Sequence, residues 1–126
     1  ARVGSMRIID KGPAGGSDAY LLDTHPKNNV RVILQPVRLN IGETLPLNAW
    51  THVAVTYASG TLRVYLNGQL KAEKSGADQP PTVTDLPLRL GADSRGSNRF
   101  VGRMDDVRIW RRRLQADEIL KLIHSE

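Results

Sequence analysis

Apolar and polar residues alternate along most of this chain, and a repeat of 3.6 residues is found only near its C-terminal end. Alternation with period two is typical of β-strands that have one buried face and one exposed face. The alternating segments lie at residues 6–9, 20–22, 30–34, 37–41, 50–57, 62–66, 70–72, 86–90 and 100–110. Short strands with turns between them predict an all-β fold, an antiparallel β-sandwich.

Asn67-Gly68 marks the clearest turn, because both residue types tolerate the positive φ angles of a type I′ hairpin turn. A second Gly-containing turn, at residues 58–60, separates the segment at 50–57 from the segment at 62–66. We therefore expect residues 50–74 to form a three-stranded antiparallel meander.

Two features indicate the structure of the C-terminal third of the chain: a proline within a strand-like segment, and apolar residues spaced as in a helix. Pro87 lies within the segment at 86–90, and proline cannot donate a ladder hydrogen bond, so we expect this strand near a sheet edge or Pro87 at the first residues of the strand. Residues 114–123 place their apolar side chains on one face and their acidic residues in the first turn, which suits the helix dipole. They predict one short C-terminal helix.

Composition narrows the class of protein. A chain of 126 residues fits a single modest domain, covering 1–126, and its longest apolar runs are too short to span a bilayer. The absence of cysteine excludes a disulfide framework, a thiolate zinc site and thiol catalysis. The formal net charge is +5, and arginine outnumbers lysine, which is compatible with recognition of carboxylate, sulfate or phosphate groups or with a neutral compositional habit.

The sequence offers no catalytic constellation. No predicted strand carries acidic residues at i and i+2, the spacing that would aim two carboxylates of a glycosidase into one cleft. Asp105 and Asp106 are consecutive, so on a strand they point to opposite faces. The histidines are not accompanied by a Gly-x-Ser-x-Gly turn. We expect a protein that is not an enzyme.

Asp105 is the most informative acidic residue. If residues 100–110 form one regular strand, its carboxylate shares a face with Val101, Val107 and Ile109 and requires a partner. One interpretation is a structural Ca²⁺ ligand at the rim of the sandwich, completed by loop carbonyls. The other is a carboxylate satisfied by backbone N–H groups or an arginine, or a bulge that turns it outward.

Aromatic residues are few, at 5% of the chain, which leaves little surface for stacking on sugars or bases. Trp50 and Trp110 lie among aliphatic residues of predicted strands, and we expect both to pack in the core.

Arginines occupy the polar side of several alternating segments, at Arg31, Arg38, Arg63, Arg89 and Arg103. Several of them on one sheet would attract anions, and a plain solvated face is the alternative. Nucleic-acid binding would require basic residues interleaved with aromatic ones, and the sequence lacks that pattern. We expect neither a nucleic-acid partner nor membrane insertion.

Two stretches carry a resemblance to a known family. The first is WTHVAVTY at 50–57, continued by LRVYLNG at 62–68, and the second is FVGRMDDVRIW at 100–110, followed by Leu114 and by Asp117-Glu118-Ile119. Together they resemble laminin-G-like domains of the concanavalin A-like lectin/glucanase type. The resemblance implies a jelly-roll sandwich, often with a structural calcium, that occurs as a non-catalytic module of large secreted bacterial enzymes and adhesins.

The resemblance also suggests a function and a site. Many family members bind glycans, acidic polysaccharides being candidates here, while others only pack against a catalytic domain. Asp105 matches the acid of the family's closing strand and so becomes the candidate calcium ligand. Family ligands lie on the concave sheet or the rim loops, and the carbohydrate contacts expected from this are Asp18, Tyr20, Arg89, Asp93, Arg95 and Asn98. The implied location is extracellular or periplasmic.

The beginning of the chain departs from the family pattern. Family members open with an F-T-x-x-x-W strand, and nothing before Met6 resembles it. We therefore expect a domain that lacks its first strand and derives from a longer multi-domain chain, with the strand supplied by upstream residues or by a second chain. A smaller departure is Gln115, which takes a position that a capping Ser or Thr holds in the family and should weaken the cap by about 1 kcal/mol.

Overall fold

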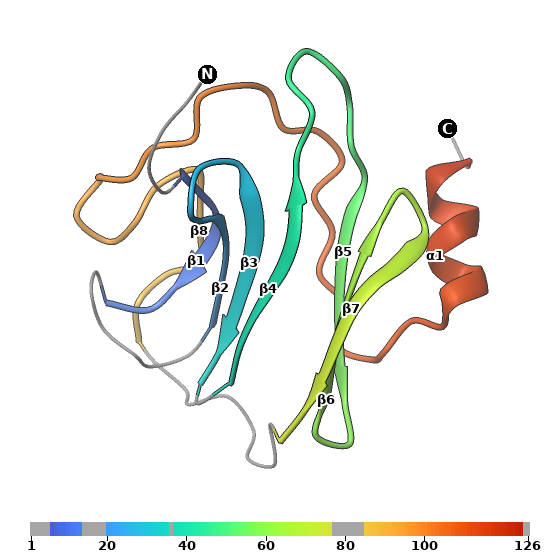
Figure 1. Ribbon diagram of the computed structural model, residues 1–126. Coiled ribbons are helices and arrows are strands. Elements are labelled where there is room, and N and C mark those ends of the chain that lie inside the picture. The colour runs from blue at the N-terminus through green and yellow to red at the C-terminus, as the bar shows by residue number, and fades with distance from the viewer. Residues whose placement is uncertain (1–5, 14–19, 36, 77–84, 125–126) are drawn as a thin grey trace.

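A computed structural model describes residues 6–13, 20–35, 37–76 and 85–124 (Figure 1). These residues form two antiparallel sheets that pack face to face, with one helix on the outside of the smaller sheet. The predicted β-sandwich with a short C-terminal helix is therefore confirmed. Within the described ranges, no helix has the length and apolar character needed to cross a membrane.

The larger sheet has five strands in the order β4-β3-β2-β1-β8. Their bounds are Met6–Lys11 for β1, Tyr20–Thr24 for β2, Asn29–Leu34 for β3, Val37–Thr44 for β4 and Arg89–Leu90 for β8. β1 to β4 follow one another across the sheet, and β8 adds to the free edge of β1. Pro87 precedes this edge strand, as predicted, although β8 is shorter than the alternating segment.

The smaller sheet is the expected meander, with the order β5-β6-β7. Its strands are Val53–Ala58 for β5, Thr61–Leu66 for β6 and Gln69–Ser75 for β7. The β6–β7 turn has φ of 50° at Asn67 and 80° at Gly68, the two positive values that a type I′ turn requires.

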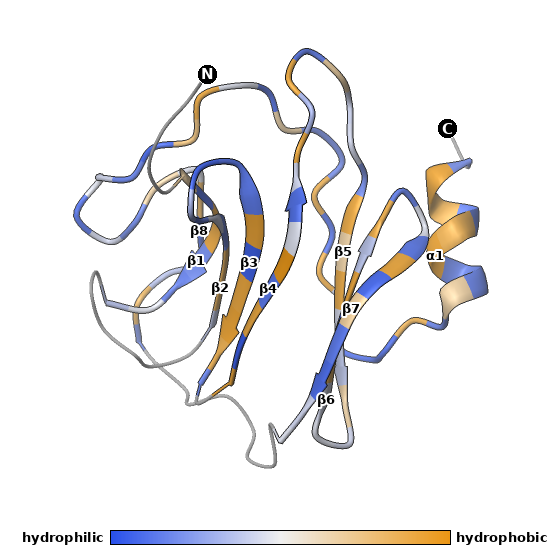
Figure 2. Cartoon of the chain, viewed as in Figure 1, coloured by the Kyte–Doolittle hydropathy of each residue, from blue (hydrophilic) through white to orange (hydrophobic). Residues whose placement is uncertain are grey.

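The core lies between the two inner faces. Alternate residues of neighbouring strands point inward, so that apolar and polar residues alternate along β3 and β4 (Figure 2). The buried cluster consists of Leu22, Val30, Val32, Leu34, Val37, Leu39, Leu62, Val64 and Leu66. Each of these side chains stabilises the fold by roughly 1.5–3 kcal/mol when it is fully buried.

Helix α1 (Ala116–Ile123) covers the outer face of the three-stranded sheet. Ile119 is buried there against Tyr65 of β6 and Leu114. The backbone N–H of Gln115 at the N-cap donates to Glu118 Oε1 over 3.0 Å, which satisfies one of the donors that a helix start leaves free. α1 is the one helix among the described residues, so no described helix covers the outer face of the five-stranded sheet.

Residues 100–110 correct two expectations. They form no strand, because Gly102 at φ 151° and Asp106 at φ 56° break the extended alternation, and Asp105 is exposed, as in the alternative in which the backbone turns it outward. Trp50 and Trp110 do not pack in the core either, since 67% and 47% of their surfaces are exposed. Trp50 lies before the first residue of β5, and Trp110 has the guanidinium of Arg112 5.9 Å from its ring centroid.

Candidate functional site

The outer face of the five-stranded sheet carries side chains in two rows that cross the strands. The register places the first row at Arg7, Asp23, Arg31 and Asn40, on β1 to β4. It places the second row at Arg89, Asp10, Leu21, Ile33 and Arg38, on β8 and then β1 to β4. Charged residues from every strand of the sheet are thus gathered on one face.

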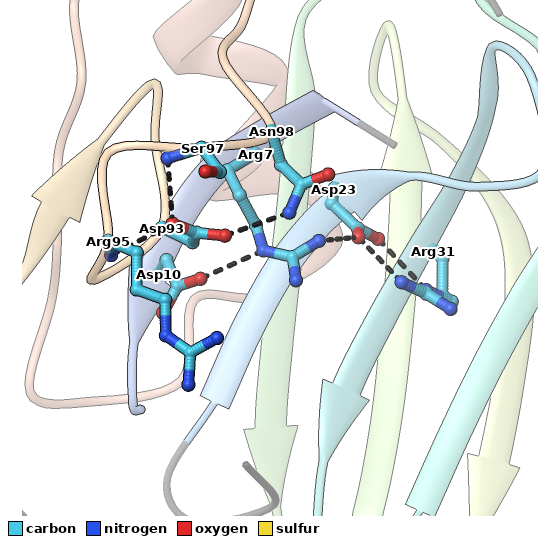
Figure 3. A network of polar contacts seen from close by, with 8 residues as sticks. All are labelled: Arg7, Asp10, Asp23, Arg31, Asp93, Arg95, Ser97 and Asn98. Atoms are coloured by element: carbon cyan, nitrogen blue, oxygen red, sulfur yellow. Dashed lines mark hydrogen bonds and ion pairs between the residues drawn. The ribbon is translucent and has the colours of Figure 1, made fainter. Parts of the chain in front are cut away.

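Asp23 organises the first row, and its side chain is fully buried. Its Oδ2 accepts hydrogen bonds from Arg7 Nη1 over 2.5 Å and from Arg31 Nη2 over 2.6 Å (Figure 3). Its Oδ1 accepts a further bond from Arg31 Nε over 2.9 Å. A buried carboxylate is tolerated only when it is paired in this way, and the two-pronged contact fixes the Arg31 guanidinium in one orientation.

Arg7 links the two rows. The register shifts between Arg7 and Ile9, and this bulge puts Arg7 and Asp10 on the same face although they are three residues apart. Arg7 Nε donates to Asp10 Oδ2 over 2.8 Å. Burial raises the pKa of Asp10 above its ordinary value, and the nearby charge of Asp93 adds to this, while Arg7 opposes the shift without cancelling it.

Asp93 fixes the loop that follows β8. Its Oδ1 accepts hydrogen bonds from the backbone N–H groups of Arg95 and Ser97, both over 2.9 Å, and its Oδ2 accepts one from Asn98 Nδ2 over 2.8 Å. Burial acts to raise the pKa of Asp93, but these three donors outweigh it and hold the pKa below its ordinary value. The loop is joined to β1 as well, since the Arg7 N–H donates to the Asn98 carbonyl over 2.8 Å.

The structure gathers most of the carbohydrate contacts expected from the sequence, though with different roles. Arg89, Asp93, Arg95 and Asn98 lie at the β1–β8 side of the sheet. Asp93 is buried and holds the loop, whereas Arg95 and Asn98 are exposed. Tyr20 packs against the core instead of standing on the outer face. Asp18 lies outside the described residues.

Sequence reasoning missed the central network of Arg7, Asp10 and Asp23. Each residue alone reads as an ordinary charged residue of a strand, and only the strand register brings the opposite charges together. The available signal was Asp23 itself, a lone acidic residue at the end of an apolar segment. Such a residue requires a cationic partner on a neighbouring strand.

The calcium expectation stays a prediction. Among the described residues, no three histidine or carboxylate side chains gather in a way that could hold a metal ion. Asp105 itself lies on an exposed segment. What the outer face does offer is a set of exposed guanidinium and amide groups at its borders, on Arg38, Asn40, Arg95 and Asn98, suited to binding oxygen-rich or anionic groups.

Comparisons with known proteins agree with this fold. A family model described as the concanavalin A-like lectin/glucanases superfamily matches residues 2–120. Adhesion G-protein coupled receptor V1 of Danio rerio is 32% identical over 131 aligned positions, which cover 91% of this chain and 2% of the receptor.

Two solved structures are also similar. A "putative carbohydrate binding protein" from Bacteroides ovatus superposes with a TM-score of 0.78 at 22% identity, over 93% of this chain and 36% of that protein. An S-layer domain-containing protein of Clostridium thermocellum superposes with a TM-score of 0.54 at 26% identity, over 96% of this chain and 64% of that one. The chain thus spans less than two thirds of each of these proteins.

Proposed function

Because this chain belongs to the concanavalin A-like lectin/glucanases superfamily, we propose that it is a non-catalytic carbohydrate-binding module of a secreted, glycan-active protein. The observation that carries the proposal is the outer face of the five-stranded sheet. There, Asp23 ties β1, β2 and β3 together through Arg7 and Arg31, exposed polar side chains border this network, and the one described helix lies on the other sheet. The fold similarity to the Bacteroides ovatus protein, whose description names carbohydrate binding, supports the same proposal.

The chemistry of the face fits a ligand rich in hydroxyl groups. Sugar hydroxyls accept and donate hydrogen bonds, so they match polar side chains that are exposed to solvent. Exposed polar side chains border the face on both sides, with Asn40 on β4 and Arg95 and Asn98 in the loop after β8. The described aromatic residues do not stand in the two rows, so polar contacts would provide most of the affinity.

A surface location is part of the proposal. One relative is named for adhesion and another for an S-layer, which supports an extracellular or periplasmic setting. In each compared protein the matching region is a part of a longer chain, as expected for a module beside catalytic or adhesin domains of a parent protein.

The test is binding to a panel of neutral and acidic polysaccharides by affinity electrophoresis and calorimetry. We expect retardation by at least one polysaccharide, and expect Asn40→Trp, which places a bulky ring on the outer face, to weaken the binding about tenfold or more. Gln69→Trp, at an exposed position of β7 in the other sheet, is the matched control and should bind like the wild type. No binding across the panel would overturn the proposal.

A second candidate is a structural or interaction domain that packs on a catalytic partner and binds no sugar. The observation in its favour is a set of exposed large apolar side chains before β5 and along the segment that leads to α1. These residues are Leu47, Trp50, Val101, Val107, Ile109 and Trp110. Exposed large apolar side chains mark protein contacts where they form a contiguous patch. This function predicts that the polysaccharide panel gives no binding while association with a partner depends on Trp50 and Ile109.

A further inference from the structure

We propose that the ligand of the outer face is an anionic glycan, carrying carboxylate or sulfate groups, that runs across the strands between β4 and β8. This inference rests on the proposed carbohydrate-binding function and names its ligand class.

The carboxylates of the two rows are already used within the protein. Asp10 and Asp23 are the acidic residues of the rows, and their exposed fractions are 4% and 0%. Both accept hydrogen bonds from Arg7, and Asp23 also accepts from Arg31. The two negative charges therefore balance the two central arginines, and the middle of the face is close to neutral.

The β4 side of the face carries positive charge that is not balanced. Arg38 ends the second row and is exposed, and it forms no ion pair with any described carboxylate. Lys74 of β7 reaches across the edge of the sandwich, and its Nζ donates to the Arg38 carbonyl over 3.1 Å. The ammonium of Lys74 thus adds a second positive charge beside the Arg38 backbone at this edge.

The β8 side carries positive charge in the same way. Arg89 stands opposite Asp10 in the register and is half-buried, and Arg95 is exposed in the adjoining loop. Neither guanidinium is ion-paired to a carboxylate of the described residues. In Figure 3 the Arg95 side chain extends from the loop with no marked contact at its guanidinium. The hydrogen bonds from the Arg95 and Ser97 N–H groups to Asp93 keep this loop in place.

The spacing of the two cationic ends sets the size of the ligand. Arg38 and Arg89 are four strands apart in one row, and neighbouring strands lie about 4.8 Å apart, so the ends are separated by about 19 Å. A single sugar cannot contact both ends, whereas a chain of several acidic sugars can. The face is therefore suited to a polyanion that crosses the strands, with its affinity rising with chain length.

The experiment compares polysaccharides that differ in charge on one backbone. Polygalacturonate is paired with its methyl ester, and dextran sulfate with dextran, which also separates carboxylate from sulfate recognition. We expect one or both anionic forms to bind and their uncharged counterparts to bind at least about tenfold more weakly. Raising the salt concentration should weaken the binding, because exposed charges are screened.

Variants locate the site. Arg38→Gln combined with Arg89→Gln should weaken binding of the anionic form about tenfold, while Arg38→Lys with Arg89→Lys should keep most of it. Arg111→Gln with Arg113→Gln removes the same charge from exposed positions outside the two rows and is expected to change affinity less than about twofold. Equal losses in both glutamine pairs would show attraction by net charge alone and would overturn the proposed site.

The outcomes separate this inference from the function on which it rests. Binding of neutral polysaccharides that equals or exceeds binding of the anionic forms would overturn the anionic ligand but leave the carbohydrate-binding module standing. No binding to any polysaccharide would overturn both. Binding of an anionic form that the Arg38 and Arg89 variants leave intact would retain the function and refute this location.

Discussion

At the scale of single residues, Asp23 is the group on which the outer face depends most. It is fully buried and holds Arg7 and Arg31, themselves about nine-tenths buried, so removing it leaves two enclosed cations without their partner. We expect Asp23→Ala to lower the free energy of unfolding by about 3–5 kcal/mol in urea titrations.

The control for Asp23 is an exposed ion pair. Glu73 pairs with Arg63 over 2.7 Å, but half of the Glu73 side chain is exposed to solvent. Glu73→Ala should therefore cost less than about 1 kcal/mol. Similar losses in the two variants would contradict the assignment of Asp23 as the centre of a buried network.

The hydrogen bonds of Asp93 predict a pH dependence. Burial raises its pKa, but the donors of Ser97, Asn98 and Arg95 outweigh burial, and the folded-state pKa lies below the ordinary 3.8. The unfolded chain then binds the proton more tightly, so Asp93 stabilises the fold above about pH 4 and less as the pH falls through its folded-state pKa. Asp93→Ala should cost about 1.5–3 kcal/mol at pH 7.

The difference in the free energy of unfolding between Asp93→Ala and the wild type should shrink as the pH is lowered below 4. Asp105→Ala, at an exposed position, should change the free energy of unfolding only slightly. Asp10 has the opposite effect on the pH dependence of stability. Its pKa is raised in the folded state, so it favours the fold when it is protonated. A constant loss for Asp93→Ala at every pH would contradict the ionised role of its carboxylate.

At the scale of elements, the β6–β7 turn supports helix α1 at close range. A Cβ added at Gly68 would lie 2.7 Å from Leu120 Cδ1 and 3.1 Å from Ile123 Cδ1, and Gly68 also has a positive φ. We expect Gly68→Ala to destabilise the protein by about 1–3 kcal/mol in thermal unfolding. Gly76→Ala, with positive φ but open space around it, gives the backbone cost alone. Adding Leu120→Ala should recover part of the Gly68→Ala loss, and no recovery would contradict the contact.

The elements also show what periodicity can and cannot predict. Strands β1 to β7 follow the alternation closely, and the β6–β7 turn follows from Asn67-Gly68, because both are local properties of the chain. The segment at 100–110 alternates equally well but forms no ladder, since a strand requires a partner with a free edge as well as a pattern. Side-chain alternation describes two faces and does not specify hydrogen bonds.

The candidate site also has a part that the sequence predicts and a part that it does not. Its loop residues were predictable, because Asp93, Arg95 and Asn98 are polar residues of a turn-rich linker in a resembling family. The network of Arg7, Asp23 and Arg31 was not, because its residues are far apart in sequence and meet only through the register and the bulge of β1. Long-range pairing of charges is a tertiary property.

At the scale of the whole molecule, the two sheets differ in what covers them. The three-stranded sheet has α1 on its outer face, while the five-stranded sheet presents its rows of charged residues. Exposed apolar residues also lie before β5 and along the segment leading to α1. The charged rows belong to β1 to β4 and β8 and these apolar residues to other segments, so glycan binding and contact with a neighbouring domain would use different residues.

The last prediction concerns the exposed apolar residues before β5 and along the segment leading to α1. Trp50 and Ile109 have 67% and 55% of their surfaces exposed, so replacing both with Gln removes few internal contacts and should change the free energy of unfolding by less than about 1 kcal/mol. Binding of the apolar dye ANS to the native protein should fall, because the exposed apolar area is smaller. Leu62→Ala, at a core position that is 1% exposed, should instead cost about 2–5 kcal/mol. If the Trp50 and Ile109 variant lost as much stability as Leu62→Ala, these side chains would be buried, as the alternation of the sequence alone suggests.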